Sequence, residues 1–215
     1  MPEVTDIFIR VSSKCPICER DTLNRYVKSK LVGPKETEED HFVVSYKWEL
    51  PQFAQVRPNH YHMWYCASCR FCDEKEIFRG EDTSGGKLEM VRDRLLIESR
   101  RPGSLISKLA EYLDYQAPLL PWRSALASHL LAMYIQEMLS PNMRQNGKIA
   151  RFALRIAWLY REREYGARAC YAPAPEDDEF LEMVSGLRES WPEMPSNEAD
   201  AINQAIAFYK LDRGG

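Results

Sequence analysis

Two Cys-x-x-Cys pairs constrain the fold of this chain more than any other feature of its sequence. They are Cys15-Pro-Ile-Cys18 and Cys66-Ala-Ser-Cys69, here called the two knuckles, and 47 residues separate them. Each knuckle places two thiolates on one tight turn, and two such turns make a tetrahedral site that suits Zn2+. We therefore predict that Cys15, Cys18, Cys66 and Cys69 bind zinc. Because four sulfur atoms leave no open position for water or substrate, the zinc is expected to be structural.

Neighbouring residues leave alternatives open for the second knuckle. Cys69 and Cys72 also form a Cys-x-x-Cys pair, so Cys72 is an alternative ligand to Cys66. His60 and His62 lie where a histidine could replace a sulfur, although a polar strand face is the favoured role for both. A set of buried or redox-active thiols is the alternative to a metal site. A reducing compartment favours the metal, because disulfides do not persist there.

Alternating apolar and polar residues predict strands before about residue 80. The segments 42–48 and 60–66 alternate most clearly, and each has an aromatic face. We expect these two strands to form a hairpin that returns the chain to the first knuckle. The segments 6–11 and 25–32 are weaker strand candidates.

Beyond a predicted linker at Gly80–Gly86, the hydrophobic period changes to about 3.6 residues, which is typical of helices. The sequence therefore predicts an α+β fold, with a small zinc-ribbon-like β module at residues 1–80 and an all-helical domain at residues 87–215. Ser104 and Ser196 are expected N-caps, because a hydroxyl there can accept a free backbone N–H. The six helices are expected at about 87–100, 104–115, 122–139, 147–165, 177–190 and 196–212.

Three of the expected helices contain related segments. They read LAMYIQE at 131–137, AWLYRER at 157–163 and IAFYKLD at 206–212. Their spacing does not fit a single 34-residue period, so a degenerate helical-repeat domain is the prediction.

The knuckles and the helical half resemble a bacterial family of unassigned activity, domain of unknown function 2225. Cys15-Pro-Ile-Cys18, the segment HYHMWYCASC at 60–69 and the segment ALRIAWLYRERE at 153–164 carry the resemblance. It implies a metal and a tetratricopeptide-like helical half, and it implies no activity. The family usually has Gly directly after each knuckle, where this chain has Glu19 and Arg70. A left-handed backbone at those positions would cost a side chain roughly 1 kcal/mol each.

Charge and motifs argue against several functions. Residues 1–80 contain 12 Lys plus Arg and 12 Asp plus Glu, so the predicted module lacks the basic surface that nucleic acid needs. No apolar run approaches the roughly 18 residues of a membrane helix, so we expect no membrane insertion and a cytoplasmic location. No glycine-rich phosphate loop, nucleophile elbow or H-E-x-x-H helix is present. His129 is expected to be a core or interface histidine, and Cys170 a core or surface thiol.

The helix expected at 147–165 combines an apolar face with a basic flank. Lys148, Arg151 and Arg155 form the flank, with Trp158 beside them, and could bind an acidic segment of a protein partner. A solvated basic face is the alternative. Reversing the three charges is expected to weaken binding with little loss of stability. The apolar face is predicted to consist of Ile149, Phe152, Ala153, Ile156, Leu159 and Tyr160.

These observations lead to the hypothesis that the chain is not an enzyme but a zinc-stabilised interaction protein. It would act as an adaptor or scaffold whose helical half binds another protein. A nucleic-acid-binding zinc ribbon is one alternative, and a thiol redox or metal-dependent enzyme is another.

Overall fold

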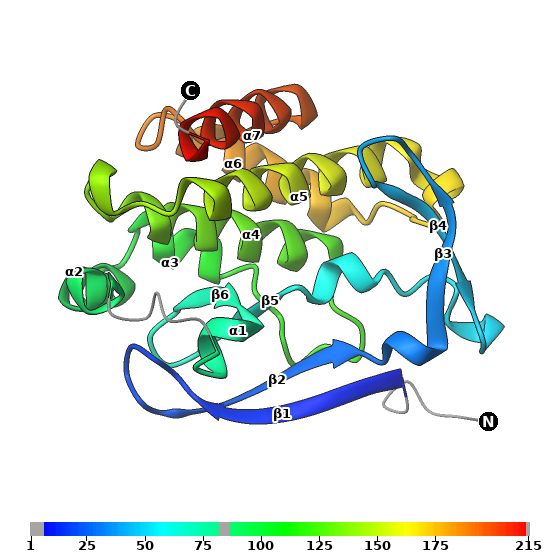
Figure 1. Cartoon of the computed structure of the whole chain (residues 1–215), viewed down its shortest axis with the longest axis horizontal. Helices are drawn as coiled ribbons and strands as arrows, with labels where there is room; N and C mark the ends of the chain where they lie inside the picture. The colour runs from blue at the N-terminus through cyan, green and yellow to red at the C-terminus, as the bar shows by residue number, and fades with distance from the viewer. Residues whose placement is uncertain (1–6, 82–86, 214–215) are drawn as a thin grey trace.

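The computed structural model describes residues 7–81 and 87–213, and it confirms the α+β fold. Three antiparallel two-stranded hairpins flank a layered group of helices. The paired strands are β1 (Phe8–Lys14) with β2 (Asp21–Val27), β3 (Val32–Thr37) with β4 (Val43–Trp48), and β5 (Met63–Tyr65) with β6 (Cys72–Glu74). In Figure 1, β1–β2 lies beneath the helices and β3–β4 at their right-hand end.

The predicted hairpin between residues 42–48 and 60–66 is wrong. Strand β4 pairs with β3, which precedes it in the chain, and β5 pairs with β6, which follows it. The segment Pro58–Tyr61 forms a short 3-10 helix in place of the first half of the second predicted strand. Pro58 lacks a backbone N–H and fixes its own φ, so it suits the start of a helical turn better than the middle of a sheet.

The observed bounds of α2 to α7 lie close to those predicted from the hydrophobic period, although α3 ends early at Ala110. Ser104 caps α3 as predicted, because its hydroxyl accepts the Ser107 N–H at 3.0 Å. At α7 the cap is Asn197 rather than the predicted Ser196, and its side chain accepts the Asp200 N–H at 2.8 Å. The bounds are α1 (Lys75–Phe78), α2 (Glu89–Arg100), α3 (Leu105–Ala110), α4 (Trp122–Glu137), α5 (Asn146–Tyr165), α6 (Pro175–Leu187) and α7 (Glu198–Asp212).

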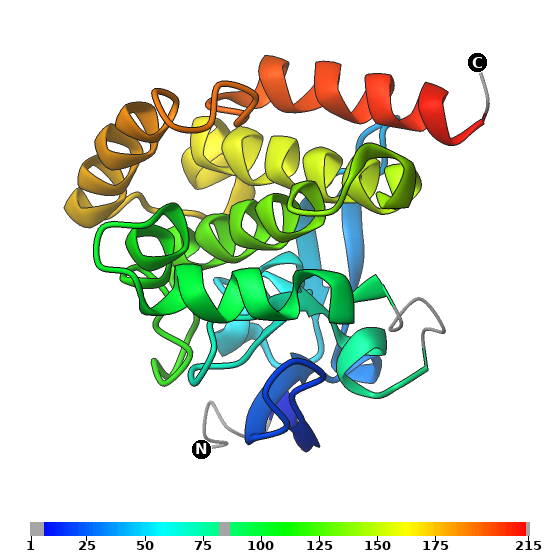
Figure 2. The same ribbon diagram turned by 90° about the vertical axis from the view of Figure 1, so that its left-hand side faces the viewer.

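Helix α4 lies at the centre of the molecule, and α5 and α7 are stacked above it in that order (Figure 2). Most of α4 is buried on every side, as expected for a helix that is apolar around its circumference. The hairpin β5–β6 packs against the opposite face of α4. The predicted apolar face of α5 is confirmed, since all six of its residues are buried.

The hairpins and the helices contribute to one continuous buried cluster. Trp64 and Phe71 from the β5–β6 region belong to the same cluster as Leu126 and Leu130 of α4. The predicted linker lies mostly at residues 82–86, outside the described part of the chain. No helix within residues 7–81 and 87–213 is long and apolar enough to cross a membrane.

Candidate metal centre

Each knuckle forms the turn of a β-hairpin. The first joins β1 to β2, and the second joins β5 to β6. In both turns the N–H of the first cysteine donates to the carbonyl five residues later, and the N–H four residues later donates back to that cysteine's carbonyl. These four bonds, 2.7–2.9 Å long, are Cys15 to Arg20, Glu19 to Cys15, Cys66 to Phe71 and Arg70 to Cys66.

The residues after the knuckles adopt the left-handed conformation that glycine favours. The φ angle is +59° at Glu19 and +61° at Arg70. Because a Cβ atom is strained there, each residue costs about 1 kcal/mol relative to glycine. Both side chains contact the helical half. Glu19 lies 3.6 Å from Arg92 of α2, and Arg70 donates a hydrogen bond to Ser107 of α3.

The two turns bring together the four predicted ligands. The Sγ atoms of Cys15 and Cys69 are 3.5 Å apart, those of Cys18 and Cys66 are 3.6 Å apart, and all four lie within 4.8 Å of one another. Zn–S bonds of about 2.3 Å in a tetrahedron require sulfur atoms about 3.8 Å apart. A disulfide bond is only about 2.05 Å long, so these are four separate thiols in an arrangement that fits a metal ion.

The electrostatics of the cluster favour a bound cation. Hydrogen bonds from Cys15 and Cys69 lower the pKa of Cys66, so this thiol ionises first. Its hydrogen bonds in turn help to raise the pKa values of Cys15 and Cys69. Without a cation, Cys15 and Cys69 therefore resist ionisation near neutral pH. A divalent metal would supply the missing positive charge, since the thiolate is the form that binds metal.

The cluster is closed to solvent on most sides. Cys15, Cys66 and Cys69 are buried, and Cys18 is partly buried. The side chains of Ile17 and Phe71 are also buried beside them in the turns. This enclosure and the four-sulfur ligand set are typical of a structural metal site rather than a catalytic one.

Cys72 lies outside the group of four. It is fully buried on β6, its Sγ donates to the Ser128 carbonyl of α4 at 3.3 Å, and burial raises its pKa well above the usual value. The arrangement therefore favours Cys66 over Cys72 as a ligand. Cys170 is exposed, which agrees with the prediction of a core or surface thiol.

The predicted polar strand face at His60 is wrong, because His60 lies in a buried ionic network that sequence reasoning missed. Its Nε2 lies 2.6 Å from Oε1 of Glu162, which is fully buried on α5. Arg57 donates from Nε to the other oxygen of Glu162 at 3.1 Å. Its Nη1 and Nη2 groups donate to the carbonyls of Val43, Val44 and Ala169.

This network fixes the middle of the N-terminal segment to α5. Burial alone would raise the pKa of Glu162, but His60 and Arg57 outweigh it and hold that pKa below its usual value. Glu162 is therefore ionised and balances the charge of the buried Arg57. In the sequence, Glu162 lies three residues after the core residue Leu159, at the edge of the apolar face, and nothing local indicates its partners.

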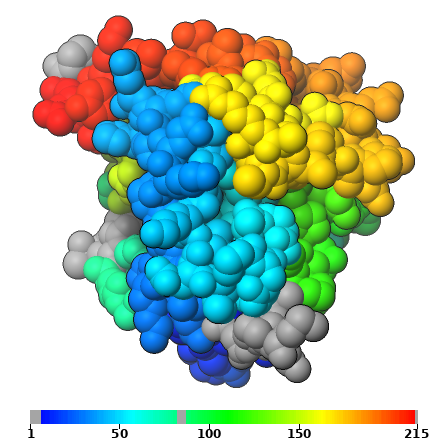
Figure 3. Space-filling view, turned by 90° about the vertical axis from the view of Figure 1, so that its right-hand side faces the viewer, coloured from blue at the N-terminus to red at the C-terminus, as the bar shows by residue number. Residues whose placement is uncertain are grey.

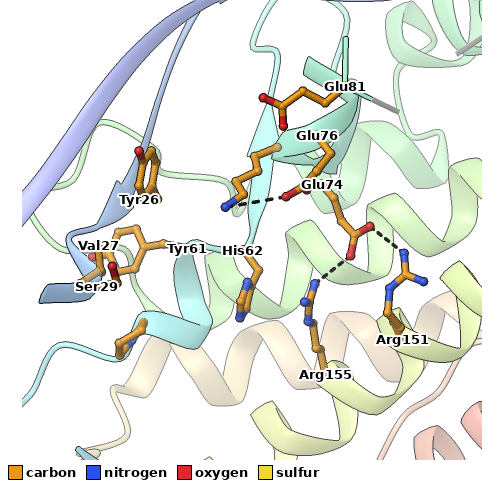
Figure 4. A pocket seen from close by; sticks show the side chains of 12 residues that line it. Tyr26, Val27, Ser29, Tyr61, His62, Glu74, Glu76, Glu81, Arg151 and Arg155 are labelled. Carbon is orange, nitrogen blue, oxygen red and sulfur yellow. Dashed lines mark hydrogen bonds and ion pairs between the residues drawn. The ribbon is translucent and has the colours of Figure 1, made fainter. Parts of the chain in front are cut away.

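His62 and His129 lie in different surroundings. His62 is exposed and points into a pocket of about 780 Å3 between Tyr61 and Arg155 (Figure 4). His129 is the core histidine that the sequence predicts: it is buried, and its Nδ1 bonds the Ala125 carbonyl at 2.7 Å. Burial lowers the pKa of His129 to about 3, so its ring is neutral.

The predicted basic flank of α5 is largely used inside the protein. Lys148 is only 4% exposed and lies 2.6 Å from Asp73, which is 1% exposed. Arg151 and Arg155 donate to the two oxygens of Glu74 at 2.9 and 3.0 Å, as Figure 4 shows. The expectation that Lys148 is exposed is therefore wrong, because β6 supplies a buried carboxylate at this position.

Trp158 is partly buried, and its indole N–H donates to Asp40 at 3.2 Å. It packs near the turn between β3 and β4 rather than standing free beside the basic residues. Binding of an acidic partner by Arg151, Arg155 and Trp158 stays a prediction. The expectation that charge reversal costs little stability does not extend to Lys148, because glutamate there would face Asp73 in a buried site.

We expect Lys148→Met to destabilise the protein by about 3 kcal/mol, because it leaves the buried Asp73 carboxylate without its counter-charge. The loss is near the low end for a broken buried ion pair, since Asp73 can become neutral by taking up a proton. Burial already raises the pKa of Asp73 to about 6 from its usual 3.8. The pKa of Asp73 is higher in the folded chain than in the unfolded chain. The ionised carboxylate therefore lowers the free energy of unfolding above pH 6, and this cost disappears as the pH falls toward 4. Urea unfolding at pH 7 and a carbon NMR titration of Asp73 measure both effects.

Arg151→Met is the matched control, since Arg151 is 55% exposed and its loss should cost less than about 1 kcal/mol. The buried ion pair between Lys148 and Asp73 would be contradicted if Lys148→Met and Arg151→Met lost equal stability. It would also be contradicted if Asp73 titrated near pH 4 in the wild-type protein.

Comparison with known proteins gives one match. The model of a family described as "Uncharacterized protein conserved in bacteria (DUF2225)" matches residues 8–211, which include both knuckles and all the helices except the last residue of α7. No curated protein and no solved structure matches the chain.

Proposed function

The chain belongs to the bacterial family DUF2225, and on this premise we propose that it is a zinc-stabilised, non-catalytic adaptor that binds a protein partner. The observation that carries the proposal is the closed set of four cysteine sulfurs within 4.8 Å of one another. Such a set holds a metal without an open position for substrate. A reducing cytoplasm suits it, because the thiols stay available to the metal there.

The position of the site supports a structural role for Zn2+. The metal would join two hairpins that are far apart in the sequence, and the residues after both knuckles contact α2 and α3. Metal binding in this arrangement would hold the hairpins against the helices. The zinc-ribbon-like part would therefore support the shape of the helical half.

The exposed side chains support a binding role for the helical half. Ile206, Tyr209 and Leu211 of α7 are each about half exposed or more, although large apolar residues usually gain stability from burial. The stack of α4, α5 and α7 is compatible with a tetratricopeptide-like arrangement, in which packed helices form a groove for a peptide or a helix.

In-cell cross-linking of the tagged full-length chain in its native bacterium tests the proposal. We expect one protein to be cross-linked repeatedly and then, once purified, to bind the zinc-loaded chain with a dissociation constant of about 1 μM or lower. Calorimetry at two salt concentrations measures this affinity. If no cross-linked protein binds the chain after purification, the adaptor function is wrong.

A further inference from the structure

A groove runs between α7, α5 and the turn that joins β3 to β4. Its volume is about 840 Å3, and its base is formed by Leu154 of α5 with Ile202, Ala205 and Ile206 of α7. Figure 3 shows the β3–β4 turn and α7 on the same face of the molecule, at its upper end. The side chain of Ile206 is 49% exposed, so the base of the groove is open to a binding partner.

Apolar residues on α7 continue the base of the groove along the helix. Ile202, Ile206 and Tyr209 are spaced by four and three residues, so they lie on one face of α7. Seven residues of α-helix span about 10 Å, which is about two turns. A helix laid beside α7 would present apolar side chains with the same spacing.

The rim of the groove is acidic. Glu38, Glu39 and Asp40 line one side and Glu198 lies on the other, while Arg161 is the one cation among the described residues that line the groove. Four carboxylates and one guanidinium give this lining a net charge of −3.

The one cation among the described residues of the lining is already shared, and Arg168, which lies outside the lining, is 3.9 Å from Glu38. Arg161 bonds Glu38 at 2.8 Å, Asp40 at 2.9 Å and Glu198 at 2.6 Å. Each of these carboxylates keeps part of its surface exposed, and Glu39 is exposed beside them. The rim therefore retains capacity for additional positive charge from outside the chain.

This charge pattern selects among the possible occupants. A second copy of the chain docked face to face would bring two acidic rims together, and like charges across an interface are unfavourable. Nucleic acid and anionic membrane surfaces are repelled for the same reason. A protein segment that carries apolar residues flanked by Lys or Arg satisfies both the base and the rim.

We propose that this groove binds an amphipathic helical segment of a partner protein, with apolar residues at positions i, i+3 or i+4 and i+7 and with flanking Lys or Arg residues. The inference rests on the proposed function, because it names the surface and the class of partner. It also differs from the acidic partner expected for the basic flank of α5, whose cations are mostly bonded within the chain.

The probe is a designed helical peptide of about 16 residues, about 24 Å long, with three leucines at this spacing and flanking lysines. A second peptide keeps the leucines and replaces each lysine by glutamate. Fluorescence polarisation measures the affinity of both for the full-length, zinc-loaded chain. We expect the basic peptide to bind at least about ten-fold more tightly than the acidic one, with affinity falling as salt rises.

Matched variants locate the binding site. Ile206→Glu should weaken the basic peptide about ten-fold or more, whereas Ile97→Glu, at a 67% exposed position on α2, should leave the affinity unchanged. Glu39→Gln should weaken binding of the basic peptide and make its affinity depend less on salt. Glu182→Gln on α6 removes the same charge from an exposed site outside the groove and should change neither the affinity nor its salt dependence. The proposed binding site would be wrong if the two variants of either pair changed the affinity equally, or if the basic and acidic peptides bound with equal affinity.

The failure of the groove and the failure of the adaptor function give different results. If the cellular partner binds Ile206→Glu as tightly as it binds the wild-type chain, the groove is wrong although the adaptor function stands. If no cellular partner binds at all, the adaptor function fails whatever the peptides do.

Discussion

Cys66→Ser is expected to reduce the zinc content from about one atom per chain to about none after dialysis against a chelator. The substitution removes one of four sulfur ligands from the cluster, and a three-thiolate site would leave the metal open to competing ligands. Metal bound only by the folded state adds stability, by about 4 kcal/mol when free zinc exceeds the dissociation constant a thousand-fold. Elemental analysis and urea unfolding with and without zinc measure the two losses.

Two cysteine variants serve as controls for the ligand assignment. Cys72→Ser removes a buried thiol that bonds Ser128, and Cys170→Ser removes an exposed one. Both should retain about one zinc per chain. If Cys72→Ser lost zinc while Cys66→Ser kept it, the assignment of the second knuckle would be wrong. If the wild-type chain held no metal and unfolded identically with a chelator, the structural zinc site itself would be disproved.

Glu162→Gln is expected to destabilise the protein by about 5 kcal/mol, the upper end for breaking a buried ion pair. The change is almost isosteric, but it leaves Arg57, only 2% exposed, without its counter-charge. It also replaces one of the two acceptor oxygens that face Arg57 and His60 by an NH2 donor. Total stabilities of single domains are about 5–15 kcal/mol, so this loss is a large fraction of the whole. Urea unfolding of the zinc-loaded variant at pH 7.5 provides the measurement.

Glu164→Gln is the matched control, because Glu164 is exposed on the same helix only two residues away. Its replacement should change the free energy of unfolding by less than about 0.5 kcal/mol. If Glu162→Gln lowered the free energy of unfolding by less than about 1 kcal/mol, the Glu162 carboxylate would not be the group that balances the charge of Arg57. Retained zinc in this variant would show that the metal site and the network contribute separately.

The parts of the structure that the sequence predicts well are those that depend on local patterns. The helical period places the buried face of α5 correctly, because residues three and four apart must share one side of a helix. The spacing within each Cys-x-x-Cys pair predicts which four cysteines lie together, and each pair lies on one turn of six residues. The α+β fold follows from the change of hydrophobic period.

The wrong predictions concern contacts between distant segments. Alternation identifies β4 as a strand, but it does not specify that β3 rather than β5 is its neighbour. The sequence predicts an exposed Lys148 because lysine is rarely buried, yet Asp73 from β6 makes its burial possible. The residues next to Arg57, His60 and Glu162 in the sequence do not indicate that these three side chains form a buried network. Their energetics depend on partners that are more than 100 residues away in the chain.

The separation of Arg57 and Glu162 by 105 residues has a consequence for biosynthesis. Ribosomes add about 5–20 residues per second, so Arg57 leaves the ribosome roughly 5–20 s before the carboxylate that neutralises it. All four cysteines of the cluster emerge well before α5 is made. A metal ion bound by these four cysteines would therefore join the two hairpins on the nascent chain while Arg57 and His60 are still hydrated. The helical half then buries Arg57 and His60 against Glu162, so this part of the native fold forms only after α5 has been made.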